Sequence, residues 1–259
     1  MVLRSNYVAF FHLIVIFHHS IAVHYDFMHI APKELQLRKF SFGGRFIYLY
    51  VWNMFLQLLY FSMAFINDFI ESKDMNSKHI ARFKKFKDYI YTTLVFPVAF
   101  DVGVMFWIFY FINPDLVVSN EVHELVPEWF CHMLRTNIVI FAILEMSWTY
   151  RKYACYLCGL LGVTIFTLAY ISWTLAVYVY TSEWVYPILE KFNWPQRIGF
   201  FGLNLFVPVT FFFIGDLLNN LLWKSKQKED SLKLQKDKEQ PPITDTTVRS
   251  TVLIRITEV

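Results

Sequence analysis

Charged residues and cysteines are both scarce in this sequence. Asp, Glu, Lys and Arg make up 17% of the 259 residues, against about 25% in an average soluble domain. The three cysteines, Cys131, Cys155 and Cys158, are too few for the disulfide framework of a small secreted protein. Cys155 and Cys158 form a C-x-x-C pair, but the second pair of ligands that a zinc site needs is missing. We therefore expect no metal site and no cofactor.

The motifs of nucleotide-dependent enzymes and of common hydrolases are missing as well. The sequence has no P-loop, no nucleophile elbow, no H-E-x-x-H and no glycine-rich nucleotide fingerprint. The net charge of +3 is too small to indicate a nucleic-acid partner. What the sequence has in abundance is long apolar runs.

Six apolar stretches are nearly long enough to cross a bilayer, and together they make up more than half of the chain. A membrane-spanning helix needs about 20 mostly apolar residues, because it rises ~1.5 Å per residue across ~30 Å of hydrocarbon. Backbone groups inside lipid must form their hydrogen bonds within the protein, so we expect helices. The sequence predicts an all-α, polytopic membrane protein, with a six-transmembrane-helix bundle in residues 1–223 and a tail in residues 224–259. The spans are expected at residues 7–23, 46–66, 90–112, 129–148, 157–181 and 198–223.

The positive charges indicate the orientation of this bundle. Seventeen Lys and Arg residues lie on the side that carries both termini, six lie on the other side, and Arg135 lies inside the fourth span. Cytoplasmic segments carry the excess of Lys and Arg, so we expect cytoplasmic termini, in the endoplasmic reticulum, another endomembrane or the plasma membrane. The first span has the short apolar core of a signal peptide. We expect it to be retained, because neither a cysteine framework nor an Asn-x-Ser/Thr acceptor indicates a secreted ectodomain.

Polar residues inside lipid are costly, so those within the spans carry most of the information about function. By residue count, Tyr50 and Arg135 lie in the outer half of the second and fourth spans. Asp101, in the third span, is the expected ion-pair partner of Arg135, because a charge near mid-bilayer costs about 2.5–3.5 kcal/mol. Two helix faces carry polar stripes: Tyr50, Asn53 and Gln57 on the second span, and His132, Arg135 and Thr136 on the fourth.

Other ionisable residues in the spans have structural interpretations. His12, His18 and His19 lie in the first span, and the adjacent pair near its end is expected in the headgroup layer. Glu145 and Asp216 lie near the predicted cytoplasmic ends of their spans, where they are expected to reach water.

The tail has the composition of a disordered segment. Residues 224–240 are rich in charge, and Pro241 and Pro242 separate them from a sequence rich in Ser and Thr. Basic residues next to a membrane favour anionic headgroups. The last four residues resemble a ligand for PDZ domains, which bury the terminal Val259 and hydrogen-bond Thr257. A PDZ-domain protein is therefore an expected partner.

Five short motifs, each at a span or its end, resemble those of the androgen-induced gene family. They are FGGRFIYL at 42–49, FPV at 96–98, ILEM at 143–146, WVYP at 184–187 and GDLLNN at 215–220. Members of that family are intramembrane hydrolases of fatty acid esters of hydroxy fatty acids. The resemblance thus implies fatty-acyl lipids as partners, with a threonine nucleophile and a histidine base within the spans.

The chain departs from that family at both catalytic positions. Counting from the motifs, Tyr50 stands at the threonine position and Arg135 at the histidine position. The Tyr hydroxyl is displaced on a rigid ring, and Arg stays protonated and cannot act as a general base. Catalysis by the family route is therefore expected to be impaired or lost.

Two interpretations of the altered site remain open. In the first, the protein is a non-catalytic lipid-binding or scaffold protein, in which Arg135 by charge and Tyr50 by its hydroxyl hold a lipid carboxylate. In the second, it is an active ester hydrolase that uses His132 and Thr136, whose side chains can meet at i and i+4.

Overall fold

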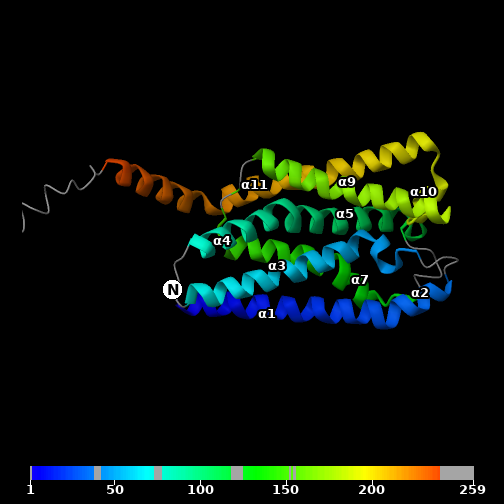
Figure 1. Cartoon of the computed structure of the whole chain (residues 1–259), viewed down its shortest axis with the longest axis horizontal. Coiled ribbons are helices and arrows are strands. Elements are labelled where there is room, and N and C mark those ends of the chain that lie inside the picture. The colour runs from blue at the N-terminus through cyan, green and yellow to red at the C-terminus, as the bar shows by residue number, and fades with distance from the viewer. Residues whose placement is uncertain are drawn as a thin grey trace, which may run out of the picture. The chain divides into compact units, whose positions relative to one another are not determined.

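The computed structural model describes residues 2–37, 42–72, 78–117, 125–151, 153 and 156–239. Every regular element in these residues is helical. The chain forms two units, residues 1–219 and residues 220–259. The first unit holds the helices that surround the candidate site (Figure 1). The predicted PDZ-ligand residues Thr257 and Val259 lie outside the described residues.

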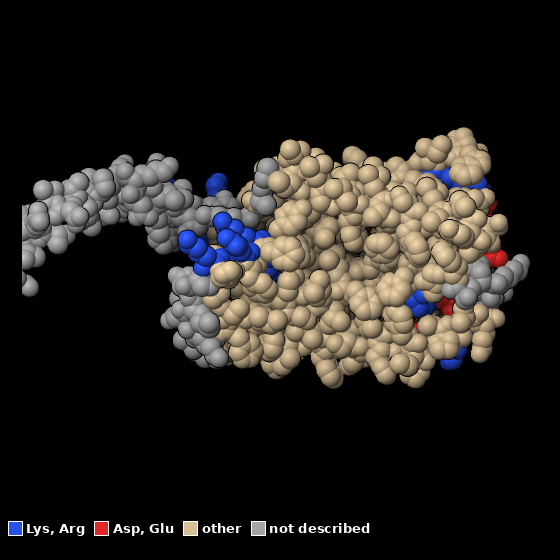
Figure 2. Space-filling model, in the orientation of Figure 1, with Lys and Arg blue, Asp and Glu red and all other residues tan. Residues whose placement is uncertain are grey.

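Six helical segments in the described residues are long and apolar enough to cross a membrane. This confirms the predicted all-α, six-span fold, whereas the predicted side of the termini stays a prediction. On the face of the first unit seen in Figure 2, acidic and basic side chains gather toward the two ends and the middle is mostly uncharged, as expected of a surface in contact with lipid. The segments are Asn6–Gln36, Leu49–Ile70, Lys78–Ile112, Glu128–Trp148, Tyr156–Thr181 and Trp194–Lys226.

The first two spans pack along each other. Helix α1 (Val2–Tyr25) continues through a π-helical turn (Asp26–Ile30) into α2 (Ala31–Leu37), and a 3-10 turn (Gly44–Ile47) precedes α3 (Leu49–Ser72). Figure 1 shows α1 and α3 side by side. The first span is longer than predicted, because the helix does not end where the apolar run ends but continues through the π-helical turn into α2.

The third and fourth spans are each made of two helices. The third joins α4 (Lys78–Ile90), a π-helical turn (Tyr91–Val95) and α5 (Phe96–Ile112), and the 3-10 turn Pro114–Leu116 follows it. The fourth joins α7 (Glu128–Arg135) and α8 (Asn137–Trp148), with a break at Thr136. The third span begins earlier than predicted, since α4 extends the apolar run with a basic, amphipathic helix.

The remaining helices are α9 (Tyr156–Thr181), α10 (Pro187–Lys191) and α11 (Trp194–Glu239). Helix α11 contains Pro208, and its backbone leaves helical geometry at Trp223. The largest core of buried apolar side chains is formed mainly by α1, α3, α5 and α8. The polar stripe on the second span points into it, and Asn53 and Gln57 are fully buried.

Two glycines set the packing around the candidate site. Gly43 has φ of 77°, a left-handed conformation that favours glycine, and it turns the chain into the 3-10 turn before α3. At Gly103 of α5, a Cβ atom would lie 2.8 Å from the carbonyl oxygen of Arg135. The absence of that Cβ lets α5 approach the end of α7 closely, and this contact fixes the backbone that carries Arg135.

Candidate functional site

Arg135 ends α7 and is enclosed by aromatic rings from two other helices. Its side chain is 7% exposed, and its guanidinium carbon lies 3.8 Å from the ring centroid of Phe106 on α5. The ring centroid of Tyr50 on α3 lies 5.2 Å from the same atom. The structure therefore brings the side chains of Arg135 and Tyr50 together.

The Arg135 guanidinium keeps a donor that nothing in the described part of the chain accepts. Its Nη1 is buried and has no hydrogen-bond partner among these residues. A guanidinium that stacks on a ring through its face keeps its N–H groups free for acceptors in its own plane. Arg135 is thus a buried cation with an unused hydrogen-bonding edge.

The hydroxyl of Tyr50 does not face the Arg135 guanidinium but is hydrogen-bonded to other residues. It accepts a hydrogen bond from Nη2 of Arg45 and lies 3.5 Å from Oδ1 of Asp26, to which it donates. Only its ring is placed against Arg135. Tyr50 therefore contributes an aromatic surface to the site, and its phenol belongs to a different polar cluster.

That second cluster, centred on Arg45, was not anticipated from the sequence. Arg45 binds Asp26 through two hydrogen bonds, from Nε at 2.8 Å and from Nη2 at 2.6 Å, and it also pairs with Glu34. The hydroxyl of Tyr48 donates to Glu34 at 2.6 Å. Burial on its own lowers the pKa of Arg45, but Tyr50 and Asp26 raise it overall, so the guanidinium stays charged. Asp26 and Glu34 lie in the segment that the sequence assigned to a loop, because the apolar run ends at Val23.

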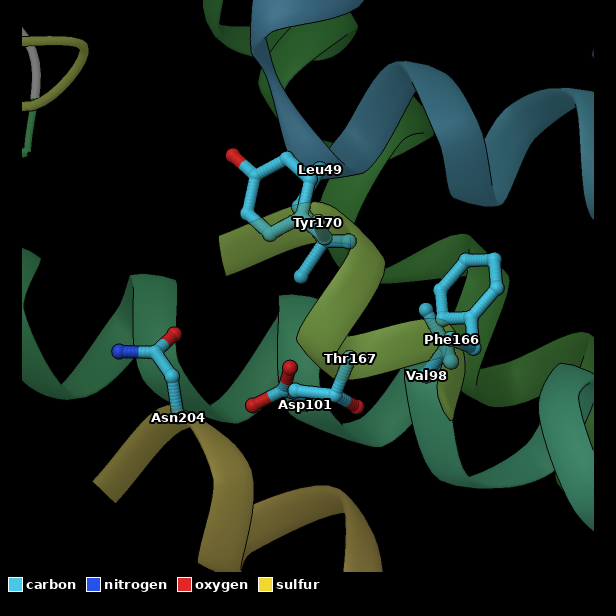
Figure 3. A pocket seen from close by; sticks show the side chains of 7 residues that line it. All are labelled: Leu49, Val98, Asp101, Phe166, Thr167, Tyr170 and Asn204. Carbon is cyan, nitrogen blue, oxygen red and sulfur yellow. The ribbon is translucent and has the colours of Figure 1, made fainter. Parts of the chain in front are cut away.

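Asp101 does not form the predicted ion pair with Arg135. Within the described residues no ion pair joins these two side chains, and Oδ1 of Asp101 is buried without a hydrogen-bond partner. Asp101 is directed toward α9 and α11, where it lines a small cavity with Thr167 and Asn204 (Figure 3). The Arg135 guanidinium instead lies against Tyr50 of α3 and Phe106 of α5.

The i and i+4 pair on the fourth span is formed as its spacing predicts. Nδ1 of His132 lies 3.0 Å from Oγ1 of Thr136. Nε1 of Trp107 donates to the same oxygen at 3.2 Å, and the Trp107 ring stacks on His132 with centroids 5.3 Å apart. His132 is exposed at the surface of the unit. The contact between a hydroxyl and a base is present, and the Trp107 N–H stabilises the oxygen in place.

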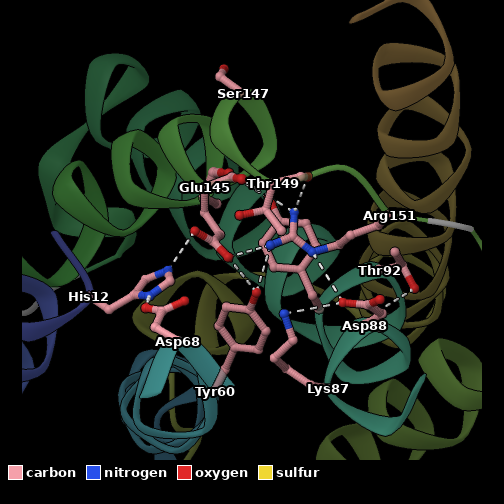
Figure 4. Close-up of polar contacts among 12 residues, drawn as sticks. His12, Tyr60, Asp68, Lys87, Asp88, Thr92, Glu145, Ser147, Thr149 and Arg151 are labelled. Carbon is pink, nitrogen blue, oxygen red and sulfur yellow. Dashed lines mark hydrogen bonds and ion pairs between the residues drawn. The ribbon is translucent and has the colours of Figure 1, made fainter. Parts of the chain in front are cut away.

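A third buried cluster lies toward the other end of the fourth span, and its charged side chains pair with one another (Figure 4). Glu145 is completely buried and accepts hydrogen bonds from Arg151, from the Tyr60 hydroxyl at 2.6 Å and from Nε2 of His12 at 2.8 Å. Nδ1 of His12 lies 2.6 Å from Asp68. An imidazole can donate from both nitrogens only when it is protonated, so this arrangement holds His12 as a cation between two carboxylates.

Arg151 completes this cluster from the segment between α8 and α9. Its side chain is 1% exposed, and its guanidinium carbon lies 3.8 Å from the ring centroid of Tyr91. Burial alone lowers the pKa of Arg151, but Tyr60 and Glu145 raise it overall. Asp88 links the cluster to Lys87, with which it pairs at 3.3 Å.

Several interpretations of individual residues are corrected by these contacts. Glu145 does not reach water but is paired inside the bundle, and His19, one of the adjacent pair expected in the headgroup layer, is buried. Asp216 is 8% exposed and accepts a hydrogen bond from Tyr156. Among the described residues, no group of three or more His, Cys, Asp or Glu side chains is placed to hold a metal ion.

Known proteins match most of the chain. A family model described as FAR-17a/AIG1-like protein matches residues 7–220. The chain is similar to the human androgen-induced gene 1 protein, with 26% identity over 209 residues that cover 78% of this chain and 86% of that protein. It is also similar to the androgen-dependent TFPI-regulating protein of Mus musculus, with 29% identity over 203 residues that cover 78% of this chain and 88% of that protein. No solved structure matches the chain.

Proposed function

The chain belongs to the FAR-17a/AIG1-like family of membrane proteins, and from this premise we propose that it binds the carboxylate of a fatty-acyl lipid at Arg135 without cleaving the lipid. The observation that carries this proposal is the free Nη1 donor of Arg135, held next to the rings of Phe106 and Tyr50. A buried cation without a counter-ion is costly, so an anionic ligand that supplies one gains a strong, charge-assisted hydrogen bond.

The surroundings of Arg135 favour a lipid over a water-soluble anion. Phe106 and Tyr50 form an apolar wall around the guanidinium, and both are less than one-tenth exposed. Arg135 itself lies on a membrane span. A ligand that reaches it from the bilayer brings its own apolar chain, which costs little to bury beside those rings.

The same residues argue against the ester hydrolysis that the family resemblance implies. An arginine stays protonated and cannot take a proton from a nucleophile. The Tyr50 hydroxyl is engaged by Arg45 and Asp26. Neither residue is therefore free to do the work of a threonine nucleophile or its histidine base.

A second candidate function rests on the 3.0 Å contact between His132 and Thr136. A hydroxyl within hydrogen-bonding distance of an imidazole is the starting arrangement of many nucleophilic sites. In this site the hydroxyl oxygen also accepts a hydrogen bond from Trp107, which lowers its nucleophilicity. Ester hydrolysis by this pair is therefore our second proposal.

Equilibrium binding of a radiolabelled long-chain fatty acid to the purified protein in detergent tests the first proposal. Arg135→Gln should weaken binding about 10- to 100-fold, because a hydrogen bond to a charged group is worth about 1.5–3 kcal/mol. Arg82→Gln, on the exposed face of α4, is the matched control and should bind like the wild type. Equal affinities for the wild type and Arg135→Gln would overturn the proposal.

Hydrolysis of a hydroxy-fatty-acid ester separates the two candidates. We expect the wild type to be inactive and the double variant Tyr50→Thr, Arg135→His to gain turnover, since it restores the residue types of the resembled family. Turnover by the wild type that disappears in Thr136→Val and in His132→Gln would favour the second candidate.

We also propose that both termini are cytoplasmic, because Lys and Arg gather on that side of the spans. The membrane is that of the endoplasmic reticulum, another endomembrane or the plasma membrane, and Thr257 and Val259 are available to a PDZ domain there. Epitope tags at either end should be detected by antibody only after permeabilisation of the plasma membrane. Detection of either tag on intact cells would contradict this topology.

A further inference from the structure

The described spans enclose a second buried ionisable side chain without an ion-pair partner, that of Asp101, and it lines a cavity that Arg135 does not line. The side chain is 3% exposed and Oδ1 has no hydrogen-bond partner in the described residues. About 10 Å³ of this cavity is open to the centre of a water molecule, which is room for about one water-sized occupant. The lining residues are Leu49, Val98, Asp101, Phe166, Thr167, Tyr170 and Asn204.

The polar side chains that line the cavity donate hydrogen bonds to backbone carbonyl groups. The Thr167 hydroxyl donates to the Val163 carbonyl at 2.9 Å, and Nδ2 of Asn204 donates to the Phe200 carbonyl at 2.8 Å. Figure 3 shows the Asn204 nitrogen directed away from Asp101. The Tyr170 hydroxyl is engaged with the Ile47 carbonyl at 3.0 Å and with the Tyr186 hydroxyl at 2.7 Å, and Figure 3 shows it directed away from Asp101. Thr167 and Asn204 therefore still offer oxygen lone pairs to the cavity.

A cavity of this kind suits a positively charged occupant. An ionised carboxylate in a membrane interior needs a positive partner or a proton, because leaving it unpaired costs several kcal/mol. Oxygen atoms from side chains can replace the water shell of a small alkali cation. Among the described residues near Asp101, Tyr170 and Tyr186 are polar but uncharged, and Arg135 is turned toward Phe106.

We propose that Asp101 and the oxygen atoms of Thr167 and Asn204 form a binding site for a single small cation, either Na⁺ or a proton. The occupant neutralises Asp101 within the span, and the cavity has room for one ion of this size. The site is separate from the lipid-carboxylate site proposed at Arg135 and does not depend on it.

The test is the melting temperature of the purified full-length protein in detergent, with NaCl exchanged for choline chloride at constant ionic strength. Each salt is examined between about pH 6 and about pH 9, the range over which a buried carboxyl group can titrate. An occupant that binds only the folded protein raises the melting temperature until the site is saturated. Asp101→Asn is the informative variant, because it keeps the shape of the side chain and removes its charge. Asp115→Asn, at an exposed acid outside the cavity, is the control.

A melting temperature that rises with NaCl in the wild type and in Asp115→Asn, but not in Asp101→Asn, identifies Na⁺ as the occupant. If NaCl has no effect, a melting temperature that falls as the pH rises in these two proteins, and falls less in Asp101→Asn, identifies a proton. The sign follows because raising the pH removes the proton that neutralises the buried carboxylate. The same dependence on salt and pH in the wild type and Asp101→Asn overturns the proposal.

A second variant keeps the test decisive if Asp101→Asn does not fold. Thr167→Val retains the carboxyl group of Asp101 and removes one oxygen atom that lines the cavity. The NaCl concentration or the pH at which half of the change in melting temperature occurs should therefore shift. An unchanged midpoint for both quantities overturns the proposal.

Discussion

The two ends of the fourth span hold buried charges in opposite states. At one end, Glu145 is joined to His12, Arg151 and Tyr60, so each strong group of the cluster has a partner. At the other end, Arg135 rests on aromatic rings and keeps an unpaired Nη1 donor. Both sites pay the desolvation cost of burying charge. Only at the first site do ion pairs within the protein offset this cost. We therefore assign the first site to stability and the second to ligand binding.

The largest effect on stability is expected from breaking the paired cluster. Glu145→Gln removes the negative charge shared by His12 and Arg151 and should destabilise the protein by about 3–5 kcal/mol, since it leaves buried charges uncompensated. Arg135→Gln, the matched change at the unpaired end, should cost less than about 1 kcal/mol, because no ion pair is lost there. Reversible unfolding in mixed detergent measures both values. Equal costs would contradict the division into structural and functional charges.

A smaller loss of stability is expected when the polar contact of α1 with α3 and α8 is removed. His12→Leu leaves Asp68 and Glu145 each without one hydrogen-bond donor and should cost about 1–3 kcal/mol. The first span should also become more accessible to protease. His24→Leu, at a position for which no ion pair with a described residue occurs, serves as the control and should have little effect.

Replacing the guanidinium group of Arg135 by the amine of a lysine should weaken lipid binding without abolishing it. Arg135→Lys keeps the positive charge but loses the planar pair of donors, so one charge-assisted hydrogen bond is lost. We expect the Kd for a fatty acid to rise by about tenfold, or ~1.4 kcal/mol. An affinity equal to that of the wild type would indicate that charge alone, and not guanidinium geometry, binds the carboxylate.

The smallest effect is expected at the Tyr50 hydroxyl. Tyr50→Phe removes the contact with Arg45 and should cost about 0.5–1.5 kcal/mol of stability. Fatty-acid affinity should stay unchanged, because the ring that lies against Arg135 is retained. A loss of fatty-acid affinity in Tyr50→Phe would indicate that the hydroxyl contacts the ligand, and would contradict its assignment to the Arg45 cluster.

The sequence was a sound guide where a single physical rule dominates. Hydropathy alone found all six spans, because lipid admits long apolar helices and little else. Helical spacing also found the contact between His132 and Thr136, since residues at i and i+4 meet on any helix. Residue counts from the span ends placed Tyr50 and Arg135 in the same half of the membrane, and the structure puts their side chains together.

Pairings between distant residues were beyond what spacing can determine. Asp101 and Arg135 lie at compatible depths, but depth does not specify which way a helix face turns, and each points to a different neighbour. The clusters of Arg45 and Arg151 join segments outside the predicted spans to residues within them. The sequence treated these segments as loops and therefore assigned their charges to water.

The most direct test of the account compares a long-chain fatty acid with the fatty alcohol of the same length, in wild type and in Arg135→Gln. The two ligands share the apolar chain and differ in the charged head. We predict that the wild type binds the acid about 10- to 100-fold more tightly than the alcohol, and that Arg135→Gln binds the two about equally. The same preference for the acid in both proteins would contradict the claim that the unpaired guanidinium of Arg135 is the carboxylate site.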